Sequence, residues 1–198
     1  MTPSYVVRIF GGVARWNELE PLVTRTQLDE ELAAGTITRL QRGTYALGDL
    51  AEVRARAAAV SGTVSHLSAA IEHGWKVKHP PTRPTITLPR NRSHPGDGLE
   101  VHWQDLSPLQ VRRRVTRPLD TVIACARAYD FDVALSVADS ALRNGAVSRQ
   151  ELRAAAEASP RTGRARAVRV VRAADGRAAN PFESCARAIA LGVRGLRV

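Results

Sequence analysis

The chain has 198 residues, 44% of them hydrophobic, which is enough for one large domain or two small ones with a packed core and excludes a disordered chain. Its net charge of +10 favours encounters with polyanions, nucleic acid first among them. The sequence has no apolar run of membrane-spanning length, and residues 1–12 lack the features of a signal peptide, so we expect a cytoplasmic protein without a membrane span.

The first predicted elements are two short helices. Ser4 is expected to cap a helix that runs to Phe10 and stops at the two glycines that follow. Val13 leads into a second helix around Trp16 to Leu19, which Pro21 helps to end.

A third helix and a β-ribbon come next. Thr24 is a capping residue, Leu28 and Leu32 share one helical face, and Gly35 supplies the left-handed stop. Two strand-like segments, ITRLQ and TYAL, then flank the tip Arg42-Gly43 and predict a hairpin. Three helices followed by a ribbon are typical of a winged helix-turn-helix, which we assign to residues 1–49.

A winged helix places its third helix in the major groove and its wing against phosphates or the minor groove. With Leu28 buried, the helix directs both Gln27 and Glu30 outward. Gln27 could then pair with adenine, and Glu30 could accept a hydrogen bond from cytosine. The predicted DNA-binding residues are Arg25, Thr26, Gln27, Glu30, Arg39, Gln41 and Arg42.

The charge of this segment opposes that assignment. Residues 1–50 carry a net charge of −1, and Asp29, Glu30 and Glu31 repel phosphates. The alternative is a small helical module that packs on the rest of the protein and touches no DNA.

Residues 50–158 are predicted to form an α/β and helical domain. Helices are expected from Leu50 to near Val60 and over SHLSAAIEHGW, where Ser65 is the cap, and strands over TITL and LEVHW. After Pro118 the pattern is helical, with a capping box from Ser148 to Glu151. His66, His73 and His79 are interpreted as structural or surface histidines, because zinc needs three or four converging ligands.

Residues 159–198 hold the basic excess, since residues 151–198 carry a net charge of +6. A break at residues 159–163 precedes a helix with an arginine arc, and a last helix starts at Asn180-Pro181. The candidate contacts for phosphate or an acidic protein partner are Arg164, Arg166, Arg169 and Arg172. A solvated helix face is the alternative for this arc.

The order of several motifs carries a family resemblance: GGVARWNEL, TRTQLDEELAAGTITRLQRGTYAL, SHLSAA, TLPR, PLDTVIACAR, VADSALRNG and NPFES. The first two resemble the N-terminal winged helix of AbiEi-type antitoxins. Together they resemble a bacterial family in which this half precedes a nuclease of the very-short-patch-repair type, in the PD-(D/E)XK superfamily. The resemblance implies a regulator of its own toxin–antitoxin type operon, with a nucleotidyltransferase-like toxin as a candidate partner.

The resemblance also exposes a departure. The family's nuclease begins with an S-P-x-E element, which matches Asn180-Pro181-Phe182-Glu183, but the strands that supply further carboxylates are absent after Glu183. A single carboxylate cannot hold a catalytic Mg²⁺, and Glu183 also suits a capping box with Asn180. We therefore predict no catalytic residue, metal or cofactor, and keep a truncated or degenerate endonuclease as the alternative.

The sequence thus predicts an α+β protein, mainly α: a winged helix at 1–49, an α/β and helical domain at 50–158, and a basic helix with a truncated nuclease start at 159–198. The predicted function is that of a cytoplasmic, DNA-binding, antitoxin-like transcriptional regulator without catalysis. Its expected partners are double-stranded DNA and a second copy of the chain, since winged-helix regulators often read paired half-sites. A pure protein-interaction module, in which the acidic third helix has lost DNA reading, is a further alternative.

Overall fold

The computed structural model describes residues 1–9, 13–48, 52–93, 96 and 98–193. This part of the chain has a mixed α/β fold that is mainly helical, with two small three-stranded sheets, in agreement with the predicted class. It divides into two compact units, one made of Met1–Val64 with Arg83–Thr116 and the other of Ser65–Thr82 with Arg117–Val198. The domain boundaries expected at residues 49 and 158 fall inside these units and stay predictions.

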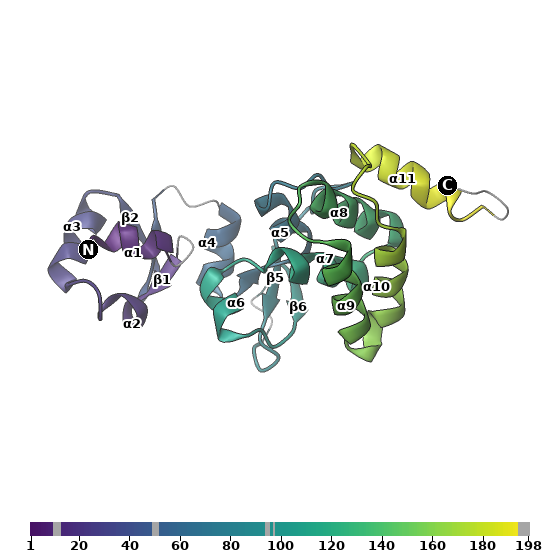
Figure 1. Cartoon of the computed structure of the whole chain (residues 1–198). Helices are drawn as coiled ribbons and strands as arrows, with labels where there is room; N and C mark the ends of the chain where they lie inside the picture. The colour runs from purple at the N-terminus through teal and green to yellow at the C-terminus, as the bar shows by residue number, and fades with distance from the viewer. Residues whose placement is uncertain (10–12, 49–51, 94–95, 97, 194–198) are drawn as a thin grey trace. The chain divides into compact units, whose positions relative to one another are not determined.

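The first unit begins with a small module of three helices and a sheet (Figure 1). Its elements are α1 (Pro3–Ile9), β1 (Val13–Arg15), α2 (Trp16–Leu19), α3 (Arg25–Ala33), β2 (Ile37–Gln41) and β3 (Thr44–Leu47). β3 lies between β1 and β2 and is antiparallel to both. The side chains that fill the core of this module include Val6, Val7, Leu19, Leu28, Ile37 and Tyr45.

The structure differs from the sequence-based expectations for this module at Ser4 and at β1. Ser4 does not cap α1, because the helix already begins at Pro3, and the Ser4 hydroxyl donates instead to the Glu31 carboxylate at 3.0 Å. The expected helix end at Phe10 and the two glycines after it lie outside the described residues. β1 was not expected at all, and it extends the predicted ribbon to three strands.

The rest of the first unit is a second small sheet with two helices. Its elements are α4 (Glu52–Ala59), β4 (Thr63–Val64), β5 (Thr85–Leu88), β6 (Glu100–Trp103) and α6 (Pro108–Arg113). β5 is central, antiparallel to β4 and parallel to β6, and it is buried along its whole length. The two longer strands were expected from the sequence, whereas α6 was not. The expected helix start at Leu50 lies outside the described residues.

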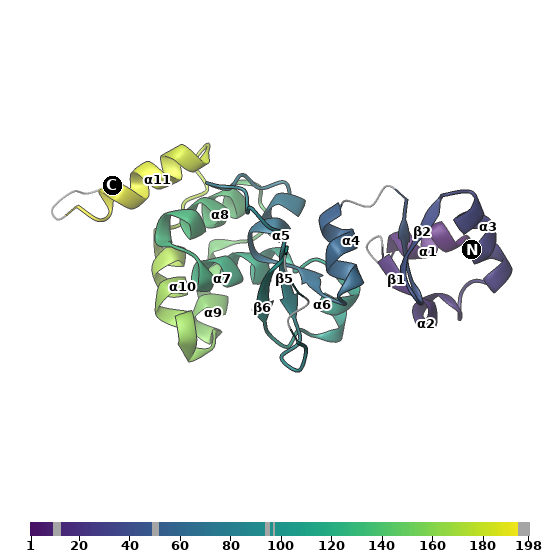
Figure 2. The same cartoon turned by 180° about the vertical axis from the view of Figure 1, so that it is seen from behind.

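The second unit is helical. It consists of α5 (His66–Glu72), α7 (Pro118–Ala128), α8 (Phe131–Arg143), α9 (Arg149–Ala158), α10 (Arg161–Ala173) and α11 (Pro181–Ala190). Figures 1 and 2 show α7, α8, α9 and α10 side by side, and α11 packs on α8. Buried alanines such as Ala134, Ala138 and Ala141 of α8 allow these helices to approach closely.

Local signals for these helices are confirmed in most cases. Pro118 starts α7, the Ser148 hydroxyl and the Glu151 side chain form a capping box, and Gly163 interrupts α10 with φ of +79°. Ser65 occupies the N-cap position of α5, but its hydroxyl makes no capping bond and lies 2.9 Å from Nδ1 of His66. Among the helices that the structure describes, none is both long and apolar enough to cross a membrane.

Candidate nucleic-acid interface

α3 owes its position to a cap at its start and one buried side chain in its middle. The Thr24 hydroxyl accepts from the Gln27 backbone N–H at 3.3 Å, which satisfies one of the free N–H groups of the first turn. Leu28 is fully buried in the core of the module, and Gly35 follows the helix with φ of +71°. The opposite face is therefore open, and Thr26 and Glu30 on it are exposed.

Gln27 differs from the other residues expected to read bases. Its Oε1 accepts from the Thr24 backbone N–H at 2.9 Å, so the side chain folds back on the helix start and is only partly exposed. Pairing with adenine uses both the oxygen and the amino group of a glutamine side chain. Gln27 would have to give up this capping bond to make such a pair.

Arg25 is held by three neighbours from separate parts of the module. Its Nη1 donates to the Tyr45 hydroxyl at 3.1 Å, its Nε lies 3.4 Å from Asp29 Oδ1, and its guanidinium lies 5.1 Å from the centre of the Trp16 ring. The Arg25 side chain nevertheless keeps 52% of its surface exposed. It is thus a cation with a fixed position at the start of α3, which suits a phosphate contact.

The three carboxylates expected to oppose DNA are not equivalent. Glu31 accepts from the Ser4 backbone N–H at 2.7 Å and from the Ser4 hydroxyl, so it binds the first turn of α1. Asp29 faces Arg25. Glu31 keeps its negative charge in these neutral hydrogen bonds, and Asp29 offsets the charge of Arg25, so the net negative charge of the segment still opposes phosphate binding.

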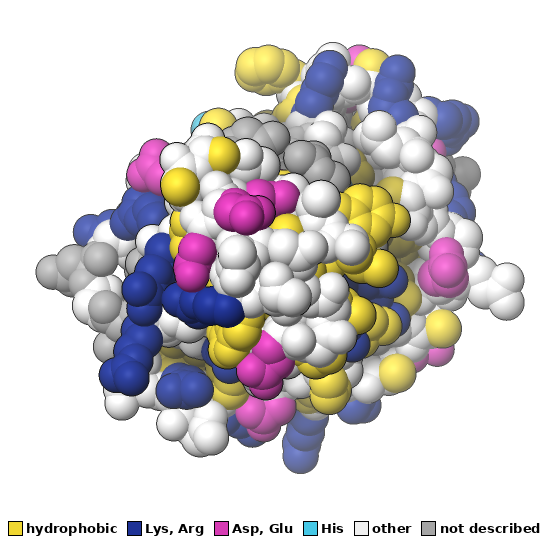
Figure 3. All heavy atoms as spheres, turned by 90° about the vertical axis from the view of Figure 1, so that its left-hand side faces the viewer, with side chains coloured by type: hydrophobic (Ala, Val, Ile, Leu, Met, Phe, Trp, Pro, Cys, Tyr) yellow, Lys and Arg dark blue, Asp and Glu magenta, His cyan; other side chains and the backbone are white. Residues whose placement is uncertain are grey.

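The β2–β3 hairpin carries the wing residues. Gly43 has φ of +74°, as its tight turn requires, and the Gly43 carbonyl accepts from the Trp16 backbone N–H at 2.8 Å. Arg39 and Arg42 are exposed, and the side chain of Gln41 lies outside the described part of the structure. Figure 3 looks onto the module that carries α3, and in this view basic side chains lie beside acidic ones rather than forming an unbroken positive surface.

The arginine arc of α10 is tied to its own unit. Arg164 Nε donates to the Ser159 carbonyl at 2.6 Å, Arg166 Nη2 donates to the Tyr129 carbonyl at 2.6 Å, and the Arg169 guanidinium lies 4.3 Å from the centre of the Phe131 ring. Arg172 is exposed at the end of the arc. A phosphate or an acidic partner would compete with the intramolecular contacts of the first three arginines.

Arg114 follows two exposed arginines in the sequence but is itself buried, with 3% of its surface exposed. It adopts φ of +60° at the end of α6, and its Nη2 lies 3.9 Å from Glu18 Oε2. Within the described residues its Nε and Nη1 have no hydrogen-bond partner, and burial lowers the pKa of its guanidinium. Arg114 therefore belongs to the interior of the first unit. Its neighbours in sequence give no sign of this.

The predicted nuclease start is occupied by a helix cap. Asn180 Oδ1 accepts from the backbone N–H groups of Phe182 and Glu183, and Pro181 is the first residue of α11, as expected. Glu183 accepts from the Ala179 backbone N–H at 2.7 Å and from the Asn180 side-chain amide at 3.1 Å, so its carboxylate stabilises the start of the helix. Over the described residues, no three His, Cys, Asp or Glu side chains converge as metal ligands would.

No family model matches the chain. Two curated relatives from Mycobacterium tuberculosis are each 32% identical over 184 residues, a match that covers 84% of this chain and 64% of the relative. They are Uncharacterized protein MT2308 of strain CDC 1551 / Oshkosh and Uncharacterized protein Rv2248 of strain ATCC 25618 / H37Rv. The chain thus spans slightly less than two thirds of the length of the curated relatives it matches.

The comparison with solved structures gives a weak likeness. The RV2827C protein from Mycobacterium tuberculosis has a TM-score of 0.42 and 16% sequence identity, with 94% of this chain and 82% of that chain covered. A likeness of this strength carries no functional argument, so a function for this chain has to be argued from its own residues and their contacts.

Proposed function

We propose that residues 1–48 form a winged helix that binds double-stranded DNA, with α3 in the major groove and the β2–β3 hairpin as the wing. The element order supports this proposal, because a helix, a strand, two helices and two strands enclose one small core. The observation that carries it is the two-sided character of α3. Leu28 anchors one face in that core, while Thr26 and Glu30 are exposed on the other.

The cations around this face suit the role that phosphate contacts have in DNA binding, which is to fix register and orientation. Arg25 is held at the start of α3 by Tyr45 and Trp16, and the exposed Arg39 and Arg42 lie on the hairpin. In the proposal, Thr26 and Glu30 contact base edges and the three arginines contact the backbone. Gln27 joins the base contacts only if it leaves its cap.

The biological role that we propose is transcriptional regulation of a toxin–antitoxin type operon, and it rests on the motif resemblance to AbiEi-type antitoxins. A nucleotidyltransferase-like toxin is the corresponding protein partner, and a homodimer would read paired half-sites in the cytoplasm. We do not extend the proposal to nuclease activity, because the Glu183 carboxylate is engaged in the cap of α11.

A gel-shift titration with the DNA upstream of the chain's own gene tests the proposal. We expect binding that weakens steeply with salt, since each phosphate neutralised contributes about 0.9 to the slope of log affinity against log salt. Arg39→Ala with Arg42→Ala should lower both the affinity and this slope. A matched control is Arg153→Ala with Arg161→Ala, which removes the same charge from exposed positions on α9 and α10.

Two outcomes would contradict the proposal: no shift of any upstream fragment, or equal losses in the two double variants. The same samples should be incubated with Mg²⁺ and labelled DNA. Cleavage that disappears in Glu183→Gln would favour the endonuclease instead.

A further inference from the structure

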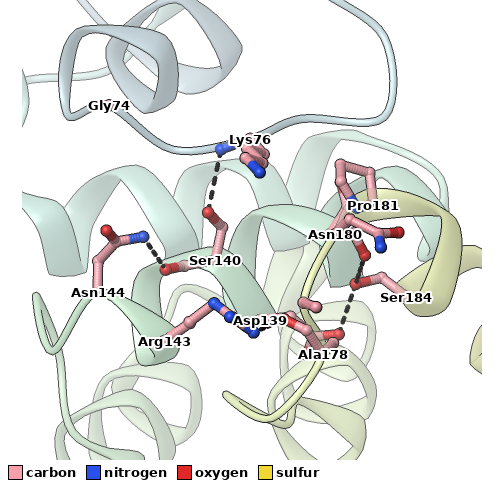
Figure 4. Close-up of a pocket in the computed structure, with 12 residues that line it drawn as sticks. Gly74, Lys76, Asp139, Ser140, Arg143, Asn144, Ala178, Asn180, Pro181 and Ser184 are labelled. Atoms are coloured by element: carbon pink, nitrogen blue, oxygen red, sulfur yellow. Dashed lines mark hydrogen bonds between the residues drawn. The ribbon is translucent and has the colours of Figure 1, made fainter.

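The second unit contains a small polar pocket of about 240 Å³ between α8 and the start of α11 (Figure 4). We call it the α8–α11 pocket. Pockets for drug-sized ligands have volumes of about 300–1,000 Å³, so this one suits a smaller molecule. The polar side chains that line it are Lys76, Ser136, Asp139, Ser140, Arg143, Asn144, Asn180 and Ser184.

The acidic group of the pocket is already neutralised by the protein. Asp139 is buried, and its carboxylate accepts from the Asp175 backbone N–H at 2.6 Å, the Ser184 hydroxyl at 2.7 Å and Arg187 Nη1 at 2.7 Å. Arg187 also donates to the Ala173 carbonyl, which fixes it beside Asp139. Asp139 therefore organises the floor of the pocket and adds no net negative charge to it.

The two remaining charged groups of the pocket are cations, and hydrogen bonds hold the guanidinium of Arg143 and the backbone of Lys76. Arg143 Nη1 donates to the Ala178 carbonyl at 3.1 Å, and a guanidinium has further N–H donors on Nε and Nη2. The Lys76 backbone N–H donates to the Ser140 hydroxyl at 3.0 Å, which places Lys76 beside α8. Figure 4 shows Lys76 on one side of the pocket and Arg143 on the other.

Ser140 supplies a third donor between these cations. Its hydroxyl oxygen accepts from Lys76, so its proton can be donated to a ligand. By contrast, the Ser136 hydroxyl accepts from the Lys78 backbone N–H and donates to the Val133 carbonyl, and the Ser184 hydroxyl donates to Asp139. Two cations and one hydroxyl thus face a space of the size of a small ligand.

We propose that the α8–α11 pocket binds the phosphate group of a small phosphate-bearing molecule. A phosphate monoester carries a charge of about −1.5 to −2 at neutral pH and has three acceptor oxygens, which match the two cations and the three donor groups. A carboxylate carries one negative charge and leaves one of the cations uncompensated. This site lies in the second unit and is independent of the proposed DNA contacts.

Calorimetric titration of the full chain with inorganic phosphate, in a buffer without phosphate, tests the proposal. We expect saturable binding that is stronger than that of acetate at equal ionic strength. Lys76→Ala should weaken it by about tenfold, which corresponds to 1.4 kcal/mol. Arg153→Ala removes one positive charge from an exposed position outside the pocket and should leave the affinity unchanged.

Arg143→Lys keeps the charge and removes the planar donor geometry, so it should weaken binding without the folding risk of an alanine at this position. Gly74 lines the pocket, and its amide signal should shift in NMR spectra on addition of phosphate. A parallel titration with phenyl phosphate distinguishes free phosphate from a phosphate monoester as the ligand. Tighter binding of the ester than of inorganic phosphate would identify a monoester. The proposal is overturned if phosphate does not saturate, or if Lys76→Ala and Arg153→Ala behave alike.

Discussion

The arginines of α10 and α11 and those of the β2–β3 hairpin differ in how their guanidinium groups are used. On α10 and α11 their guanidinium groups are largely used inside the protein, on the carbonyls of Ser159 and Tyr129 and on the carboxylate of Asp139. On the β2–β3 hairpin, Arg39 and Arg42 are exposed, in a segment whose net charge is negative. The contrast shows that the number of arginines in a segment does not tell how many of their guanidinium groups are available to a polyanion. How each donor is used is the better guide.

We expect the largest effect on stability when the carboxylate that binds an internal arginine is removed. Asp139→Ala should lower the free energy of unfolding by about 3–5 kcal/mol, because it leaves the Arg187 guanidinium without its carboxylate. Burial raises the pKa of Asp139. Asp139→Asn removes the charge and replaces one accepting oxygen with an NH2 group, but it keeps the other acceptor and the side-chain volume, so it should cost less than Asp139→Ala. Urea unfolding followed by circular dichroism measures both, with the exposed Glu157→Ala as the control. Equal stability of Asp139→Ala and Glu157→Ala would contradict this account.

Acid titration addresses a second arginine–carboxylate pair, in which the Arg177 side chain is exposed. Hydrogen bonds from Arg177 lower the pKa of Asp175 to about 2. A carboxylate with a lowered pKa contributes stability above its ordinary pKa, and that contribution is lost as the pH falls from about 4 towards 2. We expect Asp175→Asn to be less stable than the parent at pH 6, by no more than about 2 kcal/mol because solvent screens the exposed Arg177, and to lose less stability over this acid range. Parallel acid-unfolding curves for the two proteins would count against the pair.

DNA binding compares the two arginine sets directly. We expect Arg39→Ala with Arg42→Ala to reduce DNA affinity by about tenfold, or 1.4 kcal/mol, because two backbone contacts are lost. Arg164→Ala with Arg166→Ala removes the same charge from α10 and should change the affinity by less than half as much on the free-energy scale. A competition gel shift at constant ionic strength makes the measurement. The reverse order of effects would transfer the proposed interface to α10.

The smallest expected effect concerns the stability contributed by one α10 arginine. Arg166→Ala removes the bond to the Tyr129 carbonyl and should cost about 0.5–1 kcal/mol, since half of the side chain is exposed. Arg42→Ala on the hairpin should cost less than about 0.5 kcal/mol, as exposed substitutions usually do. Paired thermal melts of the two variants test whether this difference exists.

Sequence reasoning succeeded where a signal was local. Thr24 and Gly35 delimit α3, and the pair Arg42-Gly43 marks the hairpin tip, because capping and left-handed backbone depend on residues a few positions apart. It missed β1, whose three residues are too few to show an alternating pattern and which pairs with a strand far ahead in the sequence. Contacts between residues far apart in the sequence determine both β1, which pairs with β3, and the side chain of Ser4, which binds Glu31.

In the candidate sites, too, the sequence predicts the features that depend on nearby residues and misses those that depend on tertiary contacts. The sequence placed Thr26 and Glu30 on an exposed face of α3, because Leu28 fixes the helical wheel. It gave no sign that Tyr45 holds Arg25, since these residues meet only when the hairpin packs against the helix. The cluster around Asp139 draws on positions 139, 175, 184 and 187, and no spacing rule connects them.

The chain passes from one unit to the other three times, after residues 64, 82 and 116. During synthesis on the ribosome, the first unit therefore cannot be completed until α6 has emerged, although α5 of the second unit has already been made. The β4–β5–β6 sheet has to wait for the strands that come after α5. For the same reason, one proteolytic nick between residues 65 and 116 leaves each unit built from both fragments, so the nicked protein should stay together until it is denatured.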